Sequence, residues 1–265
     1  MDMYHLRQIP SEAQIQRFLR RLLFGKNVFC PRCSCRGVTA RQDRYWCPRC
    51  RRRFSLLSHT WLSCSKLSYQ RLWLLLWCYT QAVPIKQSRR LGEVSESAMR
   101  HWYDLFRAHL PENHVILEKI VQMDEAYFKR QSLIMAKQKG SRHVAYQLLQ
   151  QSSVQRQQAT VFLQQHIKPR SRLHTDGAGI YQGIERWWPV RHRTDIHRKW
   201  EFERTSEIEG LFGNLRTFIR RMYHHVTPEK LPEYVREFCV RFSSPETFES
   251  PRTFLQKTLT RAPFD

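Results

Sequence analysis

Two Cys-x-x-Cys motifs near the N-terminus constrain the fold of this chain most strongly. Cys30 and Cys33 form the first motif, Cys47 and Cys50 form the second, and 13 residues separate the two. Each motif presents two thiolates from a tight turn, and an intervening hairpin brings the pairs together around a tetrahedral ion. A redox role is the alternative for a single motif, but two in tandem favour structural zinc. We therefore predict a zinc ribbon over residues 28–57, with these four cysteines as Zn²⁺ ligands.

The other cysteines fit a reducing compartment. Cys35 lies beside the first motif and could compete as a ligand, whereas the remaining three occupy apolar stretches and are expected to be small buried residues: Cys64, Cys78 and Cys239. The first residues, MDMYHLRQIPSEAQ, lack the apolar segment of a secretory signal, and the apolar run from Leu72 to Tyr79 is too short to span a bilayer. We expect no membrane partner and a cytoplasmic location.

The charge of the chain predicts a polyanionic partner. Lys and Arg number 45 against 23 Asp and Glu, which gives a net charge of +22 and a pI near 10.2. Residues 1–57 carry 13 basic against 3 acidic side chains, which exceeds what solubility asks of a small domain. Nucleic acid is the expected partner. Arg51, Arg52 and Arg53 follow the last predicted zinc ligand and could contact the DNA backbone, although an ordinary basic hairpin remains an alternative.

Helical patterns dominate the first 110 residues. Residues 1–27 are expected to hold an amphipathic helix over 11–24, and residues 69–80 a strongly apolar helix. Within the region 58–110, Pro84 begins a further helix, Gly92 ends it, and Ser95 caps the next. This pair resembles a helix-turn-helix whose second helix offers Glu96, Ser97 and Arg100 to a major groove. Three packed helices without DNA contact remain the alternative.

Beyond Pro111 the pattern changes to that of an α/β domain with a mixed sheet, over residues 111–245. We expect strands over 120–128, 143–149, 160–167, 172–175 and 190–194, and helices over 178–187 and 207–223. This is the element order of an RNase H-like fold. The tail, residues 246–265, is expected to be loosely ordered.

Three acidic residues in different settings point to phosphodiester chemistry. Asp124 lies in the apolar run VQMDEAYF, Asp176 precedes a glycine-rich turn in LHTDGAGIY, and Glu209 lies in the helical stretch SEIEGLFGNLRTFIRR. Hard divalent cations are held by such carboxylates, and two ions together can promote an in-line phosphoryl displacement. A strand-end cap, a turn residue and a solvated helix position are the alternative interpretation.

Five segments, taken in order, carry a resemblance to a known family. They are FCPRC, RYWCPRCRRRFSLLSHTWLSCSKLSYQRLWLLLW, VQMDEAY, LHTDGAGIY and SEIEGLFGNLRTFIRRMYHHVTPEKLPEYVREFCVRF. The chain resembles insertion-sequence transposases of the IS1595 (ISXO2-like) family over roughly residues 5–245. Each short motif is weakly specific, but the ordered combination is specific.

The resemblance implies an RNase H-like DDE transposase. Asp124, Asp176 and Glu209 would then be the ligands of Mg²⁺ (or Mn²⁺), and Arg216 would take the place of a basic residue, often lysine, that grips DNA near the cleaved bond. Relatives commonly carry Asn three residues before the glutamate, where this chain has Ser206, which is a poorer substitute if that Asn supports metal or DNA binding.

The implied activity is binding of terminal inverted repeats, followed by metal-dependent cleavage and strand transfer by a two-metal mechanism. Its partners would be double-stranded DNA, as transposon ends and target, and further copies of the chain in a homodimer or larger assembly. A catalytically inactive domesticated regulator and an integrase-like nuclease without strand transfer are the alternatives. Six further residues lie near these acids in the sequence but are not expected to belong to the site: Glu125, Glu207, Asp195, His174, His192 and His197.

Overall fold

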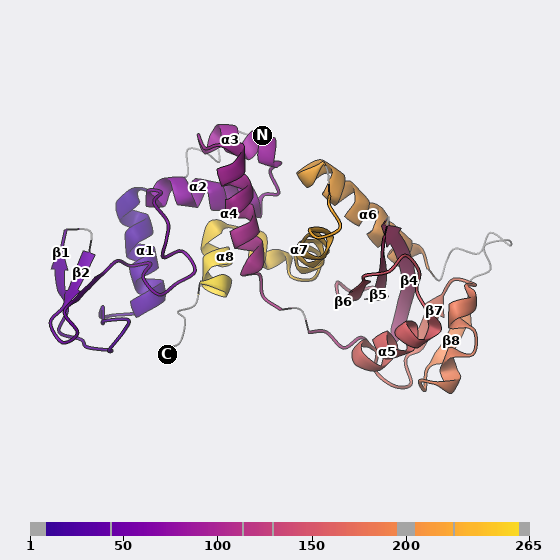
Figure 1. Cartoon of the computed structure of the whole chain (residues 1–265). Helices are drawn as coiled ribbons and strands as arrows, with labels where there is room; N and C mark the ends of the chain where they lie inside the picture. Colours follow the sequence, from indigo (N-terminus) through magenta and orange to yellow (C-terminus); the bar gives the residue numbers. More distant parts are fainter. Residues whose placement is uncertain are drawn as a thin grey trace. The chain divides into compact units, whose positions relative to one another are not determined.

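The computed structural model describes residues 9–42, 44–112, 114–128, 130–194, 205–224 and 226–259. The chain forms two compact units, the first comprising Met1–Pro111 with Glu246–Asp265 and the second Glu112–Pro245 (Figure 1). Each unit is described by itself. Within the described ranges, no helix combines the length and the apolar character needed to cross a membrane.

Helix α1 (Glu12–Phe24) begins the first unit, as the amphipathic pattern predicts. Ser11 caps it, and Gln14 closes a capping box by accepting a hydrogen bond from the Ser11 backbone. At its end, the Phe24 ring lies 5.4 Å from Phe29 and 6.4 Å from both Tyr45 and Phe54. The helix therefore packs on the cysteine-rich segment that follows it.

That segment contains a small antiparallel sheet in the order β1-β2-β3. Its strands are β1 (Thr39–Arg41), β2 (Arg44–Cys47) and β3 (Arg52–Phe54). Strand β2 ends at Cys47, directly opposite Arg52 at the start of β3. The hairpin thus holds the second Cys-x-x-Cys motif in its turn.

Three helices follow, where the sequence predicts them: α2 (Tyr69–Thr80), α3 (Ile85–Leu91) and α4 (Glu96–Ala108). Ser68 and Ser95 cap α2 and α4 through their side-chain oxygens, and Gly92 ends α3. The buried Tyr103 hydroxyl donates to the Val83 carbonyl at 2.8 Å and lies 2.7 Å from Ser88 Oγ, which joins α4 to α3. DNA contact by this pair stays a prediction.

The expectation of a loosely ordered tail is wrong. A 3-10 helix, η5 (Pro245–Phe248), leads into α8 (Pro251–Thr258), which contacts α2 of the first unit. The Phe254 ring lies 5.6 Å from Tyr79, and the Trp61 indole donates to the Thr258 carbonyl at 3.0 Å. Ser250 and Pro251 provide a helix start, and burial of Phe254 against rings far away in the sequence, such as Tyr79, stabilises the helix.

The second unit is built on a five-stranded mixed sheet with the order β6-β5-β4-β7-β8. Strand β5 is antiparallel to both neighbours, whereas β4, β7 and β8 are mutually parallel. The strands are β4 (Ile120–Phe128), β5 (Gln131–Gln138), β6 (Val144–Leu149), β7 (Arg172–Thr175) and β8 (Arg191–Thr194). The predicted mixed α/β class is confirmed.

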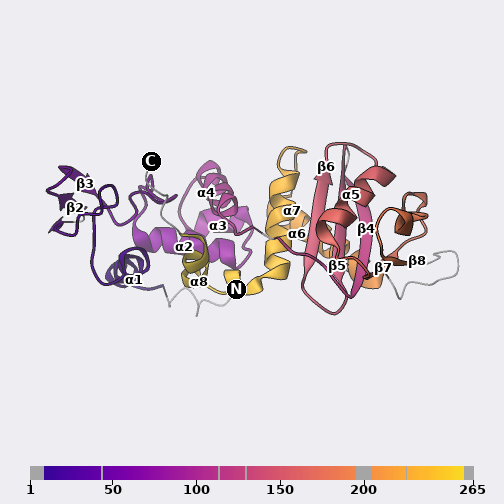
Figure 2. The same ribbon diagram turned by 90° about the horizontal axis from the view of Figure 1, so that it is seen from below.

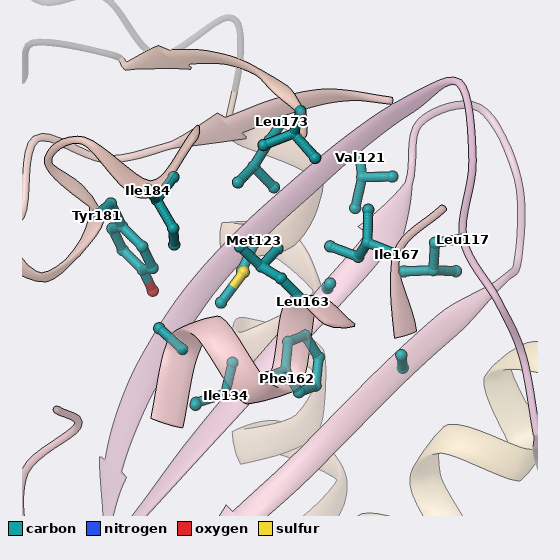
Figure 3. Close-up of a cluster of buried hydrophobic side chains, with 14 of the residues drawn as sticks. Leu117, Val121, Met123, Ile134, Phe162, Leu163, Ile167, Leu173, Tyr181 and Ile184 are labelled. Carbon is teal, nitrogen blue, oxygen red and sulfur yellow. The ribbon is translucent and has the colours of Figure 1, made fainter. Parts of the chain in front are cut away.

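Helices cover both faces of this sheet (Figures 1 and 2). On one face, α5 (Arg156–His166) and two 3-10 turns, η2 (Gly179–Tyr181) and η3 (Ile184–Arg186), enclose a core in which Phe162 and Tyr181 surround Met123 (Figure 3). On the other face, α6 (Ser206–Tyr223) and α7 (Leu231–Ser243) pack on the even-numbered side of β4. Alternation along β4 therefore decides which helix layer each side chain meets.

Two predicted elements of this unit are wrong, and one was missed. Residues 160–167 belong to α5 rather than to a strand, because Ala159, Phe162 and Leu163 repeat with a helical period and bury one face. The predicted helix over 178–187 consists of the two 3-10 turns η2 and η3. Strand β5 was missed because both of its faces are buried and its sequence, QSLIMAKQ, does not alternate between apolar and polar residues.

Candidate metal centre and active site

Asp124, in the middle of β4, and Asp176, directly after the end of β7, lie close together on adjacent parallel strands. Strands β4 and β7 are in register through Gln122 and His174, and each aspartate comes two residues later on its own strand path. Carboxylate oxygens of Asp124, Asp176 and Glu125 all lie within 4.8 Å of one another. Two of the three predicted acids are therefore brought together, with a neighbour that sequence reasoning set aside.

Glu125 approaches this cluster from the opposite face of β4. One carboxylate oxygen accepts a hydrogen bond from the buried Tyr181 hydroxyl of η2, and the other accepts one from Tyr127 at 3.3 Å. Strand alternation places Asp124 and Glu125 on opposite faces of β4. Because β7 ends at Thr175, the edge of β4 is free at this level and both carboxylates can turn toward Asp176.

Glu209 stands next to the cluster rather than within it. It lies in the first turn of α6, where its Oε1 accepts a hydrogen bond from Thr205 Oγ1 at 3.0 Å. Its oxygens are outside the group held within 4.8 Å, but its negative charge helps to raise the pKa of Asp124. Helix α6 thus brings the third predicted acid to the even-numbered face of β4, where Asp124 also lies.

The cluster concentrates negative charge without a protein cation. Burial raises the pKa of Asp124 to about 7, and the charges of Glu125, Asp176 and Glu209 add to the effect. Burial, with the charge of Asp176, also raises the pKa of Glu125. In the part of the chain that the structure describes, no Lys, Arg or His pairs with Asp124, Glu125 or Asp176. Oxygen ligands with this surplus charge suit a hard divalent cation.

Three other polar residues of α6 differ in their surroundings. Arg216 is exposed on the same helix face as Glu209, seven residues further on, and Ser206 is exposed at the first position of α6. Glu207 is engaged elsewhere, because its carboxylate binds Lys137 of β5 and the Gly140 backbone N–H. Glu207 therefore anchors the start of α6 instead of joining the cluster.

Two of the histidines near the site, His174 and His192, lie among the described residues, and the side chains of both are largely buried. His192 Nε2 lies 2.8 Å from Thr175 Oγ1, and burial lowers the pKa of His192. His174 is buried on β7. Asp195 and His197 lie outside the described residues.

A second cluster consists of sulfur atoms. The Sγ atoms of Cys30, Cys33, Cys47 and Cys50 lie within 4.8 Å of one another, with Cys30 and Cys50, and Cys33 and Cys47, each 3.5 Å apart. Cys35 is not in this group. The Cys50 backbone N–H lowers the pKa of the Cys47 thiol to about 6. Four converging sulfurs match the predicted ligand set for tetrahedral Zn²⁺.

The predicted DNA-contacting side chains are exposed in the first unit. Arg51, Arg52 and Arg53 all face solvent where β3 begins. Arg100 forms an ion pair with Glu96 at 2.8 Å, and Ser97 Oγ lies 3.0 Å from Ser95 Oγ at the start of α4. Their role in binding stays a prediction.

Comparison with solved structures gives matches of low sequence identity only. No curated protein matches the chain. A simian T-cell lymphotropic virus intasome, in complex with PP2A regulatory subunit B56 gamma, matches at 12% identity and TM-score 0.37, over 72% of this chain and 76% of that one. The catalytic core domain of BIV integrase matches at 17% identity and TM-score 0.31, over 49% and 83%. At these scores neither structure bears on fold or function.

The family match covers most of the second unit. Residues 129–243 match the model of the ISXO2-like transposase domain. The matched range contains Asp176, Glu209 and Arg216 and begins five residues after Asp124. The predicted resemblance is confirmed: the chain carries an ISXO2-like transposase domain of the IS1595 family.

Proposed function

We propose that this protein is a DDE transposase that cleaves the ends of a DNA element and joins them to target DNA. The observation that carries the proposal is the convergence of Asp124 and Glu125 of β4 with Asp176, which follows β7, in a transposase-family domain. Counted from β4 as the first strand, the sheet order is 3-2-1-4-5 with only the second strand reversed, which supports an RNase H-like catalytic fold.

Asp124, Glu125 and Asp176 fit a divalent cation through their chemistry. All three offer oxygen atoms, they lie within 4.8 Å, and the burial of Asp124 among like charges disfavours its ionised form unless a cation compensates it. Bound Mg²⁺ (or Mn²⁺) would supply Lewis-acid stabilisation of the phosphate and a water of lowered pKa.

The protein's own residues would position this chemistry. Asp124 and Asp176 are held rigidly, because each belongs to or directly follows a strand of the central sheet. Tyr181 fixes the rotamer of Glu125, and Thr205 fixes that of Glu209. Arg216, exposed on α6 on the face of Glu209, would hold a DNA phosphate.

The first unit would bind the DNA. Four clustered sulfurs support a structural Zn²⁺, exposed Arg51, Arg52 and Arg53 suit phosphate contacts, and α4 with Ser97 and Arg100 suits a major groove. Joining needs two element ends at once, so we expect a homodimer or larger assembly on DNA, acting at the nucleoid.

A strand-joining assay tests the proposal. The zinc-loaded full chain is incubated with duplexes that carry the inverted repeats flanking its coding region, a plasmid target and Mg²⁺. We expect cleavage and joined products with the wild type, none with Asp124→Asn or Asp176→Asn, and wild-type yields with Glu118→Gln, an acid of the same unit paired with Lys168. DNA binding without any cutting by the wild type would indicate a regulator, and cutting without joining a nuclease.

A further inference from the structure

A basic groove lies on the first unit, away from the cysteines and from α4. Its volume is about 590 Å³, and its walls come from α1, α2 and α8. Three arginines line it, two from α1 and one from α8, namely Arg17, Arg21 and Arg252. No acidic side chain is among the described residues that line it.

Two aromatic rings form part of the wall of the groove. Phe18 of α1 and Trp73 of α2 meet edge to face, with ring centroids 5.8 Å apart. The Arg252 guanidinium lies over the Phe18 ring, 5.0 Å from its centroid. This cation–π contact places Arg252 beside the arginines of α1, so a residue from the end of the chain completes a surface begun near its start.

The three arginines are available to a ligand. All three are exposed, and across the described residues none of them forms an ion pair with a carboxylate. By contrast, Lys257 on the same helix is neutralised by Glu246 at 2.6 Å. Arg17 Nε donates to the Ala13 carbonyl of its own helix, at 3.4 Å. Three guanidinium groups without a carboxylate partner around one groove attract anions with several negative oxygens, and the guanidinium group is well shaped for phosphate.

We propose that this groove binds the sugar-phosphate backbone of duplex DNA, independently of base sequence. A groove of about 590 Å³ is too small for a duplex but accommodates phosphates of one strand along its edge. Trp73 is 8% exposed and Arg252 covers the Phe18 ring, so neither ring offers a free face for base stacking. The groove therefore adds affinity and orientation rather than sequence recognition.

The inference rests on the DNA-binding part of the proposed function and not on the metal centre. The probe is a duplex of unrelated sequence, and the measurement is the dissociation constant of the zinc-loaded full chain over a range of salt concentrations. Arg252→Gln is compared with Lys257→Gln, an equal loss of charge on the same helix. Thermal unfolding and zinc content establish that each variant is folded.

We expect Arg252→Gln to weaken binding several-fold and to reduce the slope of log K against log salt by about one, the value for one lost phosphate contact. The double variant Arg17→Gln/Arg252→Gln should reduce this slope by about two. Lys257→Gln should retain the wild-type slope. Equal slopes for Arg252→Gln and Lys257→Gln overturn the groove proposal alone, whereas a wild type that binds no duplex overturns it together with the proposed function.

Discussion

The side-chain oxygen of Gln122 accepts a hydrogen bond from the Ile208 backbone N–H at 3.0 Å. Gln122 is fully buried on β4, two residues before Asp124, and Ile208 lies in the first turn of α6, one residue before Glu209. One hydrogen bond therefore sets the distance between the strand and the helix that carry two of the proposed site residues. The same N–H also donates to the Thr205 carbonyl at 3.1 Å, so the Gln122 contact is one branch of a bifurcated hydrogen bond.

Replacing Gln122 should damage both stability and activity. Gln122→Leu removes one of the two acceptors of the Ile208 N–H, which also donates to the Thr205 carbonyl at 3.1 Å, and this loss costs about 0.5–1.5 kcal/mol of unfolding free energy. Urea denaturation measures this loss, and strand joining is compared at a temperature where both proteins remain folded. We expect residual joining well below wild type because Glu209 loses its fixed position. Wild-type joining by folded Gln122→Leu would mean that this bond does not position the site.

Tyr181 should control the carboxylate of Glu125. Tyr181→Phe removes the buried hydroxyl that donates to Glu125 and leaves the ring packing in place. We expect the Mg²⁺ concentration for half-maximal cleavage to rise, since Glu125 is no longer held toward Asp124 and Asp176. Tyr127→Phe removes the longer, exposed hydrogen bond of 3.3 Å and serves as the matched control, with a smaller effect. Equal metal dependence for wild type and Tyr181→Phe would exclude this role for Tyr181.

The raised pKa of Asp124 predicts how stability depends on pH without Mg²⁺. The folded-state pKa is about 7 and the model-peptide value is 3.8, so the neutral acid is favoured by folding. The contribution of Asp124 is fully present below about pH 4 and is lost as pH rises through about 7. Asp124→Asn should therefore be more stable than wild type at pH 8, on the order of 1–3 kcal/mol, and about equal at pH 4.

Urea denaturation of the two proteins in Mg²⁺-free buffer at several pH values checks this prediction. A stability gap that does not widen between pH 4 and pH 8 would contradict the burial of an uncompensated carboxyl group at this position.

Replacing a glycine on the exposed face of α6 by alanine should stabilise this helix. A Cβ at Gly213 would meet no atom within 4 Å, and alanine lowers the free energy of a helix interior by about 1 kcal/mol relative to glycine. Gly213→Ala should raise the unfolding free energy by that amount. Gly183, whose φ is +68°, is the control, and Gly183→Ala should destabilise the fold. Thermal denaturation shows whether each variant is more or less stable than the wild type. A destabilised Gly213→Ala would mean that this face of α6 is covered.

The sequence predicts those elements whose signals are local. Helix α1 follows from Ser11 and Gln14, and β4 and β7 follow from their residue pattern. The proximity of Asp124 to Asp176 could therefore be expected from two strands of one sheet. Strand β5 lacks a periodic signal because both of its faces are buried. Helix α8 depends on contacts with distant aromatic rings, which no local pattern reveals.

Glu125 shows most clearly where sequence reasoning fails. Strand alternation correctly assigns it to the face opposite Asp124, where it meets Tyr181. The strand edge at which both side chains turn toward Asp176 exists only because β7 ends early. That edge depends on the register between two strands about 50 residues apart, and the signal that could have found Glu125 is its position directly after Asp124.

Cation binding tests the central claim most directly. Mn²⁺ is titrated into the zinc-loaded full chain and followed by electron paramagnetic resonance, with wild type, Asp124→Asn, Asp176→Asn and Glu118→Gln compared at pH 8. We predict a saturable site in wild type and Glu118→Gln that is lost in both aspartate variants. Undiminished Mn²⁺ binding by Asp124→Asn and Asp176→Asn would contradict a metal centre formed by these two aspartates.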